Sequence, residues 1–242
     1  MTRVQLFVTC LVDGFAPEVG TAVTEVLERA GCTVEFPDAQ TCCGQPAYNA
    51  GLVADAEAMA AYNVEVLDAT DGPIVVPSGS CTDMLVHHVP ALAEGTGWEQ
   101  AARRVAARTR EFTQFLVDDL GISDLGVLRE GCRVVYHSSC HGMRNLGLGR
   151  HARALIDSVT GVERVEPAQP DQCCGFGGLF AVEMPEVSAA IMDAKLDDLE
   201  ATGADLVVGG DVSCLLHLEG GLRRRNSPLR VCHIAELLAT EP

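Results

Sequence analysis

The sequence predicts an α/β protein built from two tandem repeats of a Rossmann-like domain with a parallel sheet, related by a pseudo-two-fold axis. Short apolar runs that suit buried strands alternate with longer stretches that suit helices. A pattern of cysteines in the first half also recurs in the second half. Strands separated by helices of this length pair in parallel, with right-handed crossovers.

The first half of the chain shows the alternation from its start. Residues 4–9 form an apolar run that predicts a strand ending at Cys10. Pro17 then begins an amphipathic stretch that continues to Ala30, with Gly31 as its stop signal. The remaining elements expected in this half are a strand at 33–36, a helix at 52–69 and a buried strand at 74–76.

The second half repeats this order. It predicts strands at 133–136, 163–166, 206–208 and 229–233, helices at 150–159 and 185–201, and a last helix ending at 239. Residues 98–120 are predicted as an extra helical segment without a counterpart. The expected domains are therefore a first cysteine-rich domain (1–97), a helical connector (98–130) and a second cysteine-rich domain (131–242).

Each half contains one Cys-Cys-Gly triplet, flanked by a single cysteine upstream and another downstream. Upstream, 31 residues separate Cys10 from Cys42 and 32 separate Cys140 from Cys173. Downstream, 37 residues separate Cys43 from Cys81. In the second half the downstream gap, from Cys174 to Cys214, is 39 residues. A chain of this composition would contain such a triplet by chance about once in twenty cases, so the matched pair indicates a duplicated unit.

The flanking cysteines each follow a predicted strand, and the triplets lie in loops after the middle strands. Ligands of open parallel sheets collect outside the carboxyl ends of the strands. We therefore expect eight thiols along one edge as candidate metal ligands: Cys10, Cys42, Cys43 and Cys81 in the first repeat, and Cys140, Cys173, Cys174 and Cys214 in the second.

Four cysteines per repeat match the ligand count of a structural zinc site or of an iron–sulfur cluster. Adjacent side chains point apart, so a vicinal pair fits two irons of a cluster more easily than one tetrahedral ion. The Cys-x-x-Cys spacing common in zinc sites is absent. Gly44 and Gly175 are expected to let the backbone turn tightly at the cofactor and to leave N–H groups free to bond sulfur.

Other residues near the repeated cysteines are weaker candidates. His217 lies three residues after Cys214, on the same helix face, and is predicted to contact the cofactor as an additional ligand or proton donor. Met84 holds the matching place in the first repeat. Three cysteines have no repeated partner and are interpreted as packing residues: Cys32, Cys132 and Cys232.

Composition narrows the class of protein. The chain has 242 residues, 48% of them hydrophobic, but no apolar run reaches the roughly 18 residues that a membrane span needs. The start of the chain reads as a strand and not as a signal peptide, so we expect a cytoplasmic protein, in which cysteines favour metal or redox chemistry over disulfides. A net charge of -17 disfavours nucleic acid and anionic membrane surfaces as partners.

The motifs around these cysteines resemble the cysteine-rich CCG-domain family. The resemblance covers essentially the whole chain and is carried by segments 7–13, 42–49, 78–81 and 173–178. Members include the cysteine-rich subunit of heterodisulfide reductase and the cysteine-rich parts of glycolate oxidase and anaerobic glycerol-3-phosphate dehydrogenase. The chain is most similar to the stand-alone, two-domain members that act in lactate utilisation.

This resemblance implies an iron–sulfur electron-transfer subunit of a complex that oxidises L-lactate to pyruvate. Its partners would be companion subunits, one of them a ferredoxin-like iron–sulfur protein. The broader family binds a non-cubane [4Fe–4S] cluster through motifs ending in Cys-x-x-Cys, whereas Met84 and His217 hold the last position here. A cluster in one or both repeats is therefore expected, with zinc in one as an alternative. Two other functions stay open: a zinc-binding scaffold and a metal-free thiol–disulfide oxidoreductase.

Overall fold

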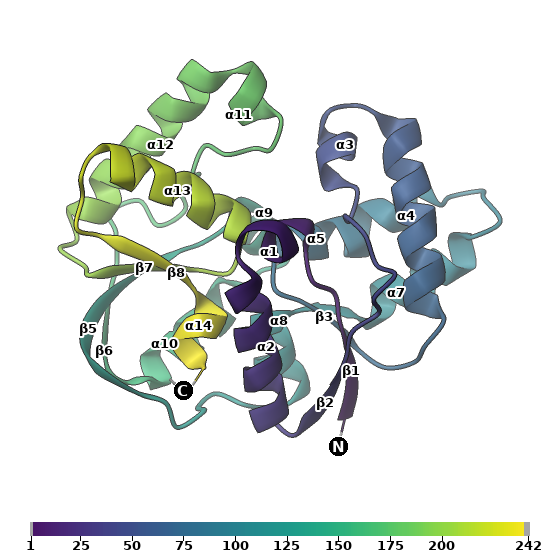
Figure 1. Cartoon of the computed structure of the whole chain (residues 1–242), viewed down its shortest axis with the longest axis horizontal. Helices are drawn as coiled ribbons and strands as arrows, with labels where there is room; N and C mark the ends of the chain where they lie inside the picture. The colour runs from purple at the N-terminus through teal and green to yellow at the C-terminus, as the bar shows by residue number, and fades with distance from the viewer. Residues whose placement is uncertain (1, 240–242) are drawn as a thin grey trace.

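Two four-stranded parallel sheets form the framework of the computed structural model, which describes residues 2–239 (Figure 1). The first sheet has the order β2-β1-β3-β4 and the second has the equivalent order β6-β5-β7-β8. The first sheet comprises β1 (Thr2–Leu6), β2 (Cys32–Glu35), β3 (Ile74–Val76) and β4 (Thr109–Glu111). The second comprises β5 (Leu128–His137), β6 (Thr160–Val165), β7 (Leu206–Gly209) and β8 (Arg230–His233). The predicted α/β fold with two tandem repeats is confirmed.

Each sheet and its helices form one lobe: residues 2–119 are called the first lobe and residues 128–239 the second lobe. Helices from both lobes make a shared layer between the two sheets (Figure 1). There α2 packs against α14 and α8 packs against α10, and one apolar core joins the lobes. These helices are α2 (Pro17–Arg29), α8 (Phe112–Gln114), α10 (Gly149–Ser158) and α14 (Ile234–Leu238).

Each lobe has a second core on its outer side. The longer outer helices are α4 (Val53–Asp68) and α7 (Glu99–Arg108) in the first lobe and α12 (Pro185–Glu200) and α13 (Val212–Arg224) in the second. Shorter segments complete the fold: α1 (Cys10–Phe15), α3 (Gln45–Asn49), α5 (Gly79–Asp83), η1 (Met84–His88), α6 (Val89–Leu92), η2 (Phe115–Asp119), α9 (Cys140–Arg144) and α11 (Phe180–Glu183).

The segment predicted as a helical connector contains a strand. Thr109–Glu111 forms β4, which pairs with β3 just as β8 pairs with β7, so residues 98–120 are not helical throughout and do have a counterpart. The strand has three residues, two of them charged, and therefore shows no apolar run in the sequence. The domain boundaries at residues 97 and 130 stay predictions.

Hydrogen bonds join the two lobes where they meet at the carboxyl ends of their strands, a region called the seam below. They link the helices that follow the central strands. Asp211 Oδ2 accepts from the Ser78 hydroxyl and from the Ser80 N–H, both at 3.0 Å. Nearby, α5 and α9 approach closely enough that a Cβ on Gly79 would lie 3.0 Å from the Cα of Gly142. The two lobes therefore meet backbone against backbone at the carboxyl ends of their strands.

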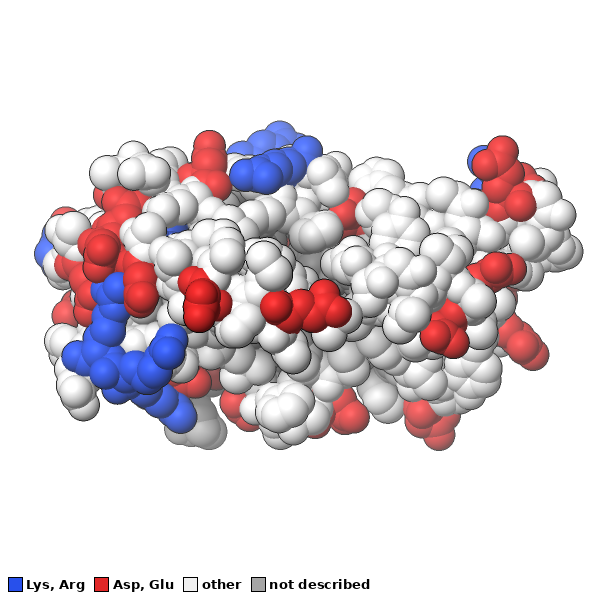
Figure 2. Space-filling model, turned by 90° about the horizontal axis from the view of Figure 1, so that it is seen from above, with Lys and Arg blue, Asp and Glu red and all other residues white. Residues whose placement is uncertain are grey.

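Charge is unevenly distributed over the surface. Figure 2 shows the face from which α3, α11 and α12 project: acidic side chains are spread along it, most basic ones lie in one half of it, and its middle is mostly uncharged. In the described part of the chain, no helix has the length and apolar character needed to cross a bilayer.

Glu111 is a buried carboxyl at the seam. It accepts hydrogen bonds from the Thr113 N–H at 2.7 Å and the Gln114 N–H at 3.1 Å, and it begins α8. Burial raises the pKa of Glu111 to about 7, against the effect of these bonds, and the charge of Asp211 adds to the rise. Ionised Glu111 therefore costs the folded protein free energy that the unfolded chain does not pay.

We predict that Glu111→Gln removes this cost. A raised folded-state pKa means that the stabilisation is complete below about pH 4.5 and is lost as the pH rises to about 7. The variant should therefore gain stability relative to the wild type as the pH rises from 5 to 8, by on the order of 3 kcal/mol. Urea unfolding at each pH measures this difference. The exposed Glu94→Gln variant is the control, and parallel pH profiles for wild type and Glu111→Gln would contradict the prediction.

Candidate metal centre

The four single cysteines lie in the first turns of helices that directly follow central strands. Each helix begins with a capping side chain that accepts a backbone N–H: Thr9 for α1, Ser78 for α5, Ser139 for α9 and Asp211 for α13. The cysteine is the first helical residue in α1 and α9 and the third in α5 and α13. The caps thus fix the four thiols at the carboxyl edges of the sheets, in the same way in both lobes.

The Cys-Cys-Gly loops turn at glycines with left-handed backbone conformations. Gly44 has φ of 89° and Gly175 has φ of 90°. A Cβ on Gly175 would lie 2.5 Å from the Ser188 carbonyl oxygen, so the loop can approach α12 only with glycine here. The Gly175 N–H donates to Cys173 Sγ at 3.3 Å, and the Gly44 N–H lowers the pKa of Cys42. Both turns direct a backbone N–H at sulfur.

The structure brings the four predicted thiols of the first lobe together. Cys10 Sγ lies 3.6 Å from Cys42 Sγ, and Cys43 Sγ lies 3.2 Å from Cys81 Sγ. The Cys42 and Cys43 thiols also interact, which links the two pairs into one chain of four sulfurs. Cys43 and Cys81 are buried in the outer core of this lobe, whereas Cys10 is exposed.

The second lobe gathers its four thiols in the same arrangement. Cys174 Sγ lies 3.1 Å from Cys214 Sγ, both in the outer core of this lobe. Cys140 and Cys173 interact at the outer end of the row of four sulfurs, and Cys173 also contacts Cys174. All eleven cysteines are free thiols.

Charge is shared within each thiol set. A hydrogen bond from the Cys10 thiol, supported by Cys43, lowers the pKa of Cys42 to about 3 although burial opposes this. Bonds from Cys140 and then Cys174 lower the pKa of Cys173 in the same way. The donors Cys10 and Cys140 have raised pKa values because they give their protons to these bonds and are partly buried. Cys42 in the first set and Cys173 in the second are therefore thiolates stabilised by neighbouring thiols.

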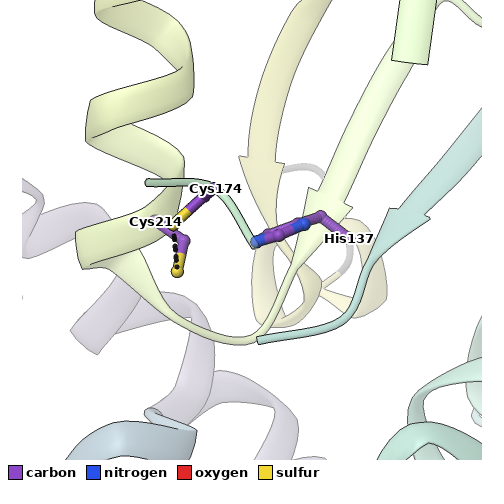
Figure 3. Close-up of side chains that lie close together, drawn as sticks. All are labelled: His137, Cys174 and Cys214. Atoms are coloured by element: carbon purple, nitrogen blue, oxygen red, sulfur yellow. Dashed lines mark hydrogen bonds between the residues drawn. The ribbon is translucent and has the colours of Figure 1, made fainter. Parts of the chain in front are cut away.

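His137 also lies at the second thiol set, although sequence reasoning did not single it out. Its nearer ring nitrogen and the sulfurs of Cys174 and Cys214 all lie within 4.8 Å of one another (Figure 3). A bond from the Cys174 thiol lowers the pKa of Cys214 to about 6 against burial, and the His137 ring acts in the same direction. The signal available in the sequence was its place three residues before Cys140, at the end of a predicted strand.

His217, the histidine that the sequence singled out, lies beside the second Cys-Cys-Gly loop. Its Nε2 atom is 3.4 Å from the Ser188 hydroxyl, which itself donates to the Gly175 carbonyl at 2.8 Å. Its ring centroid lies 5.8 Å from that of Phe176, and burial lowers its pKa. These contacts place His217 beside Ser188 of α12 and the Phe176 ring of the loop. Its predicted contact with a cofactor stays a prediction.

Residues of the outer helices anchor the loops that precede the triplets. In the first lobe, buried Asn63 accepts from the Thr41 N–H at 2.9 Å and donates to the Cys42 carbonyl at 2.8 Å. In the second lobe, fully buried Lys195 donates to the Gln169 carbonyl at 3.2 Å. Burial lowers the pKa of Lys195, while nearby acidic side chains and the Cys174 and Cys140 sulfurs oppose the shift.

The three unrepeated cysteines lie on strands and pack against the core shared by the two lobes. Cys32 begins β2 and is buried, whereas Cys132 on β5 and Cys232 on β8 are partly buried. Burial raises the pKa of Cys232 to about 12. These positions agree with the interpretation of the three cysteines as packing residues.

The residues present fit a thiolate-ligated metal group in each lobe. Four sulfurs are in contact, two of them on a turn that supplies N–H donors, and the buried sulfurs are shielded from water. Thiolates on one tetrahedral zinc ion lie about 3.8 Å apart, given a zinc–sulfur bond of about 2.3 Å. The observed pairs therefore suit one tetrahedral ion as well as a cluster, and metal analysis separates the two.

Comparison with known proteins identifies the repeated unit. The cysteine-rich domain model of the CCG family matches residues 4–86 and 134–219. The chain belongs to the CCG cysteine-rich domain family. The two matched segments contain all eight repeated cysteines, and they also include both His137 and His217.

Three curated relatives carry the name Lactate utilization protein A or Lactate utilization protein A 1. The protein of Geobacillus kaustophilus is 47% identical over 237 residues, that of Anoxybacillus flavithermus 45% identical, and that of Bacillus cereus 43% identical. Each alignment covers 98% of both chains. A hypothetical protein from Helicobacter pylori has a similar fold, with a TM-score of 0.65 at 10% identity over 98% of this chain. The chain spans about half of that protein, covering 48% of it.

The thiol contacts predict an unusual order of alkylation in the metal-free protein. At pH 6, iodoacetamide should label Cys42 before Cys10, although Cys10 is more exposed, because only thiolates react and Cys42 carries the charge. Cys173 should likewise react before Cys140. Peptide mass spectrometry over time measures the order, with Cys232 as an internal control of raised pKa. Faster labelling of Cys10 and Cys140 would show that the charge lies elsewhere.

The turn at Gly175 predicts a specific cost of adding a side chain. Gly175→Ala should lower the free energy of unfolding by about 1–3 kcal/mol, because φ is 90° and the new methyl group would collide with the Ser188 carbonyl. Gly220→Ala is the matched control, since Gly220 is exposed in α13 with nothing within 4 Å of its Cβ position. That change should be neutral or stabilise by up to about 1 kcal/mol. Equal losses in urea unfolding would contradict this role of Gly175.

Proposed function

We propose that the protein is the iron–sulfur electron-transfer subunit of a complex that oxidises L-lactate to pyruvate. The observation that carries the proposal is the convergence of four thiols at the carboxyl edge of each sheet. The names of relatives that align with 98% of this chain support the lactate pathway. Companion subunits, one of them ferredoxin-like, would carry out lactate chemistry and exchange electrons with this chain.

In this proposal two ligand sets hold the clusters, and a bound cluster supplies one-electron transfer. The sets are Cys10, Cys42, Cys43 and Cys81 in the first lobe and Cys140, Cys173, Cys174 and Cys214 in the second. The outer cores exclude water from the buried half of each set. The N–H groups at Gly44 and Gly175 stabilise negative charge on sulfur, which tunes the reduction potential.

Sulfur contacts of 3.1–3.6 Å also support the two other functions that thiols can serve. One is a scaffold in which zinc joins the loops, and the other is a thiol–disulfide oxidoreductase that closes and opens these pairs. Either function would use the same residues, so composition of the purified protein is the decisive measurement.

Anaerobic purification tests the proposal. We expect brown protein that contains iron and labile sulfide, and about half of both should be lost in the Cys42→Ser/Cys43→Ser variant, which removes one ligand set. Cys32→Ser, in the shared core, is the control and should keep the full iron content. Colourless protein with zinc would instead show the scaffold, and metal-free protein with titratable thiols would show the exchange enzyme.

Growth on lactate tests the pathway separately from the metal. Deleting the gene should abolish growth with L-lactate as carbon source, and the wild-type chain, but not the Cys42→Ser/Cys43→Ser variant, should restore it. Unimpaired growth of the deletion strain would remove the assignment to lactate oxidation, whatever metal the protein holds.

A further inference from the structure

We propose that His137 is a metal ligand of the second lobe, so that the two centres differ in chemistry: thiolates alone in the first lobe, thiolates and an imidazole in the second. This inference rests on the proposed function, because it assigns a ligand to one of the two proposed centres. It adds a residue that neither the repeated cysteine pattern nor the comparisons single out.

The surroundings of the His137 imidazole point to a metal. The His137 side chain ends β5 and is 1% exposed. Apart from an interaction with the Cys214 thiol, its ring nitrogens have no hydrogen-bond partner among the described residues. Leaving a buried polar group short of partners destabilises the folded protein, so such a group needs an explanation. A bond from one nitrogen to a metal supplies one.

The His137 ring is directed at the thiols of the second lobe. It points from the end of β5 into the space between the Cys-Cys-Gly loop and the start of α13 (Figure 3). One of its nitrogens and the sulfurs of Cys174 and Cys214 lie within 4.8 Å of one another, so a small inward shift of the side chains would bring all three onto a single metal. The three side chains come from three separate segments and are all buried. Imidazole and thiolate together are ligands that zinc and iron both accept.

The two lobes differ in the ring that they place at this position. Cys10 and Cys140 occupy equivalent places, and three residues before them lie Phe7 and His137. Phe7 is fully buried and packs in the outer core with Cys43 and Cys81. An apolar ring therefore fills this position in the first lobe without any polar cost. Packing does not require the histidine in the second lobe, so its nitrogen has another use.

The other histidines near the seam and the second thiol set have partners already. His141 Nδ1 is 2.6 Å from Asp83, a carboxylate of the first lobe. His217 faces Ser188 and Phe176, and His233 accepts the Ala235 N–H at 3.1 Å at the start of α14. His137 is thus the imidazole that points at the thiols and has no partner besides Cys214. An imidazole that takes the place of one of the four thiolates would raise the potential of an iron–sulfur centre, because it is neutral. The second centre should therefore be the better electron acceptor.

Pulsed electron paramagnetic resonance on the reduced, anaerobically purified protein tests the assignment. The Cys42→Ser/Cys43→Ser variant leaves the second centre alone, and labelling histidine with ¹⁵N marks the imidazole. We expect a ¹⁵N coupling to this centre that disappears when His137→Phe is added. That change inserts the residue that the first lobe uses at the same place, so the fold is expected to tolerate it. The reciprocal Cys173→Ser/Cys174→Ser variant should show no histidine coupling.

Two further variants sharpen the result. His151→Gln changes another buried histidine, which bonds Asp118 away from the thiols, and should leave the ¹⁵N coupling intact. His137→Cys should keep the iron but lower the midpoint potential of the second centre, since it puts an anionic ligand where the imidazole is neutral. A coupling that survives His137→Phe, or an iron-loaded second centre without any coupling, would overturn the inference while leaving the proposed function intact.

Binding of Co²⁺ tests His137 even if the purified protein contains no iron. A protein without iron would contradict the proposed cluster, but it would not by itself contradict the role of His137. Metal-free Cys42→Ser/Cys43→Ser protein is titrated with Co²⁺, whose absorption reports thiolate and imidazole ligands. Loss of a ligand should weaken binding about tenfold or more in the His137→Phe background. Equal Co²⁺ affinity and equal spectra with and without His137 would show that it is no ligand.

Discussion

The contact between the Cys-Cys-Gly loop and the helix after the central strand determines the rest of the site. Cys43 meets Cys81 at 3.2 Å and Cys174 meets Cys214 at 3.1 Å, although about forty residues separate the partners. Parallel pairing makes this possible, because every strand then ends at the same edge and every following helix begins there. Helix caps and left-handed glycines fix the remaining freedom of the thiols.

The two thiol sets are not independent modules, because the seam couples the helices that carry them. Asp211 caps α13, the helix of Cys214, and also accepts from Ser78, which caps α5, the helix of Cys81. A shift of one helix would therefore move the other. The shared core between the sheets resists such a shift, since helices of both lobes bury their apolar faces in it. The fold thus holds two sets of ligands in one fixed relation.

The sequence was sufficient for most of the fold and for the meeting of the cysteines, because both depend on patterns that recur. Strands such as Ile74–Val76 are apolar runs, and duplication reveals which cysteines belong together. It was insufficient for β4, because two of its three residues are charged and the strand pairs only because the sheet offers an edge. His137 was missed for a related reason: burial and the lack of a partner are tertiary properties that spacing does not encode.

The residues around the thiols that differ between the lobes, as described below, all shift the reduction potential of the proposed centres in the same sense. The first lobe surrounds its thiols with Phe7 and Met84, both fully buried and apolar, and with neutral Asn63. At the corresponding places the second lobe has His137, His217 and buried Lys195. Reduction adds negative charge to a cluster, and apolar surroundings oppose it, whereas imidazole and ammonium groups favour it. If both proposed centres hold clusters, these exchanges would therefore give the centre of the second lobe the higher reduction potential.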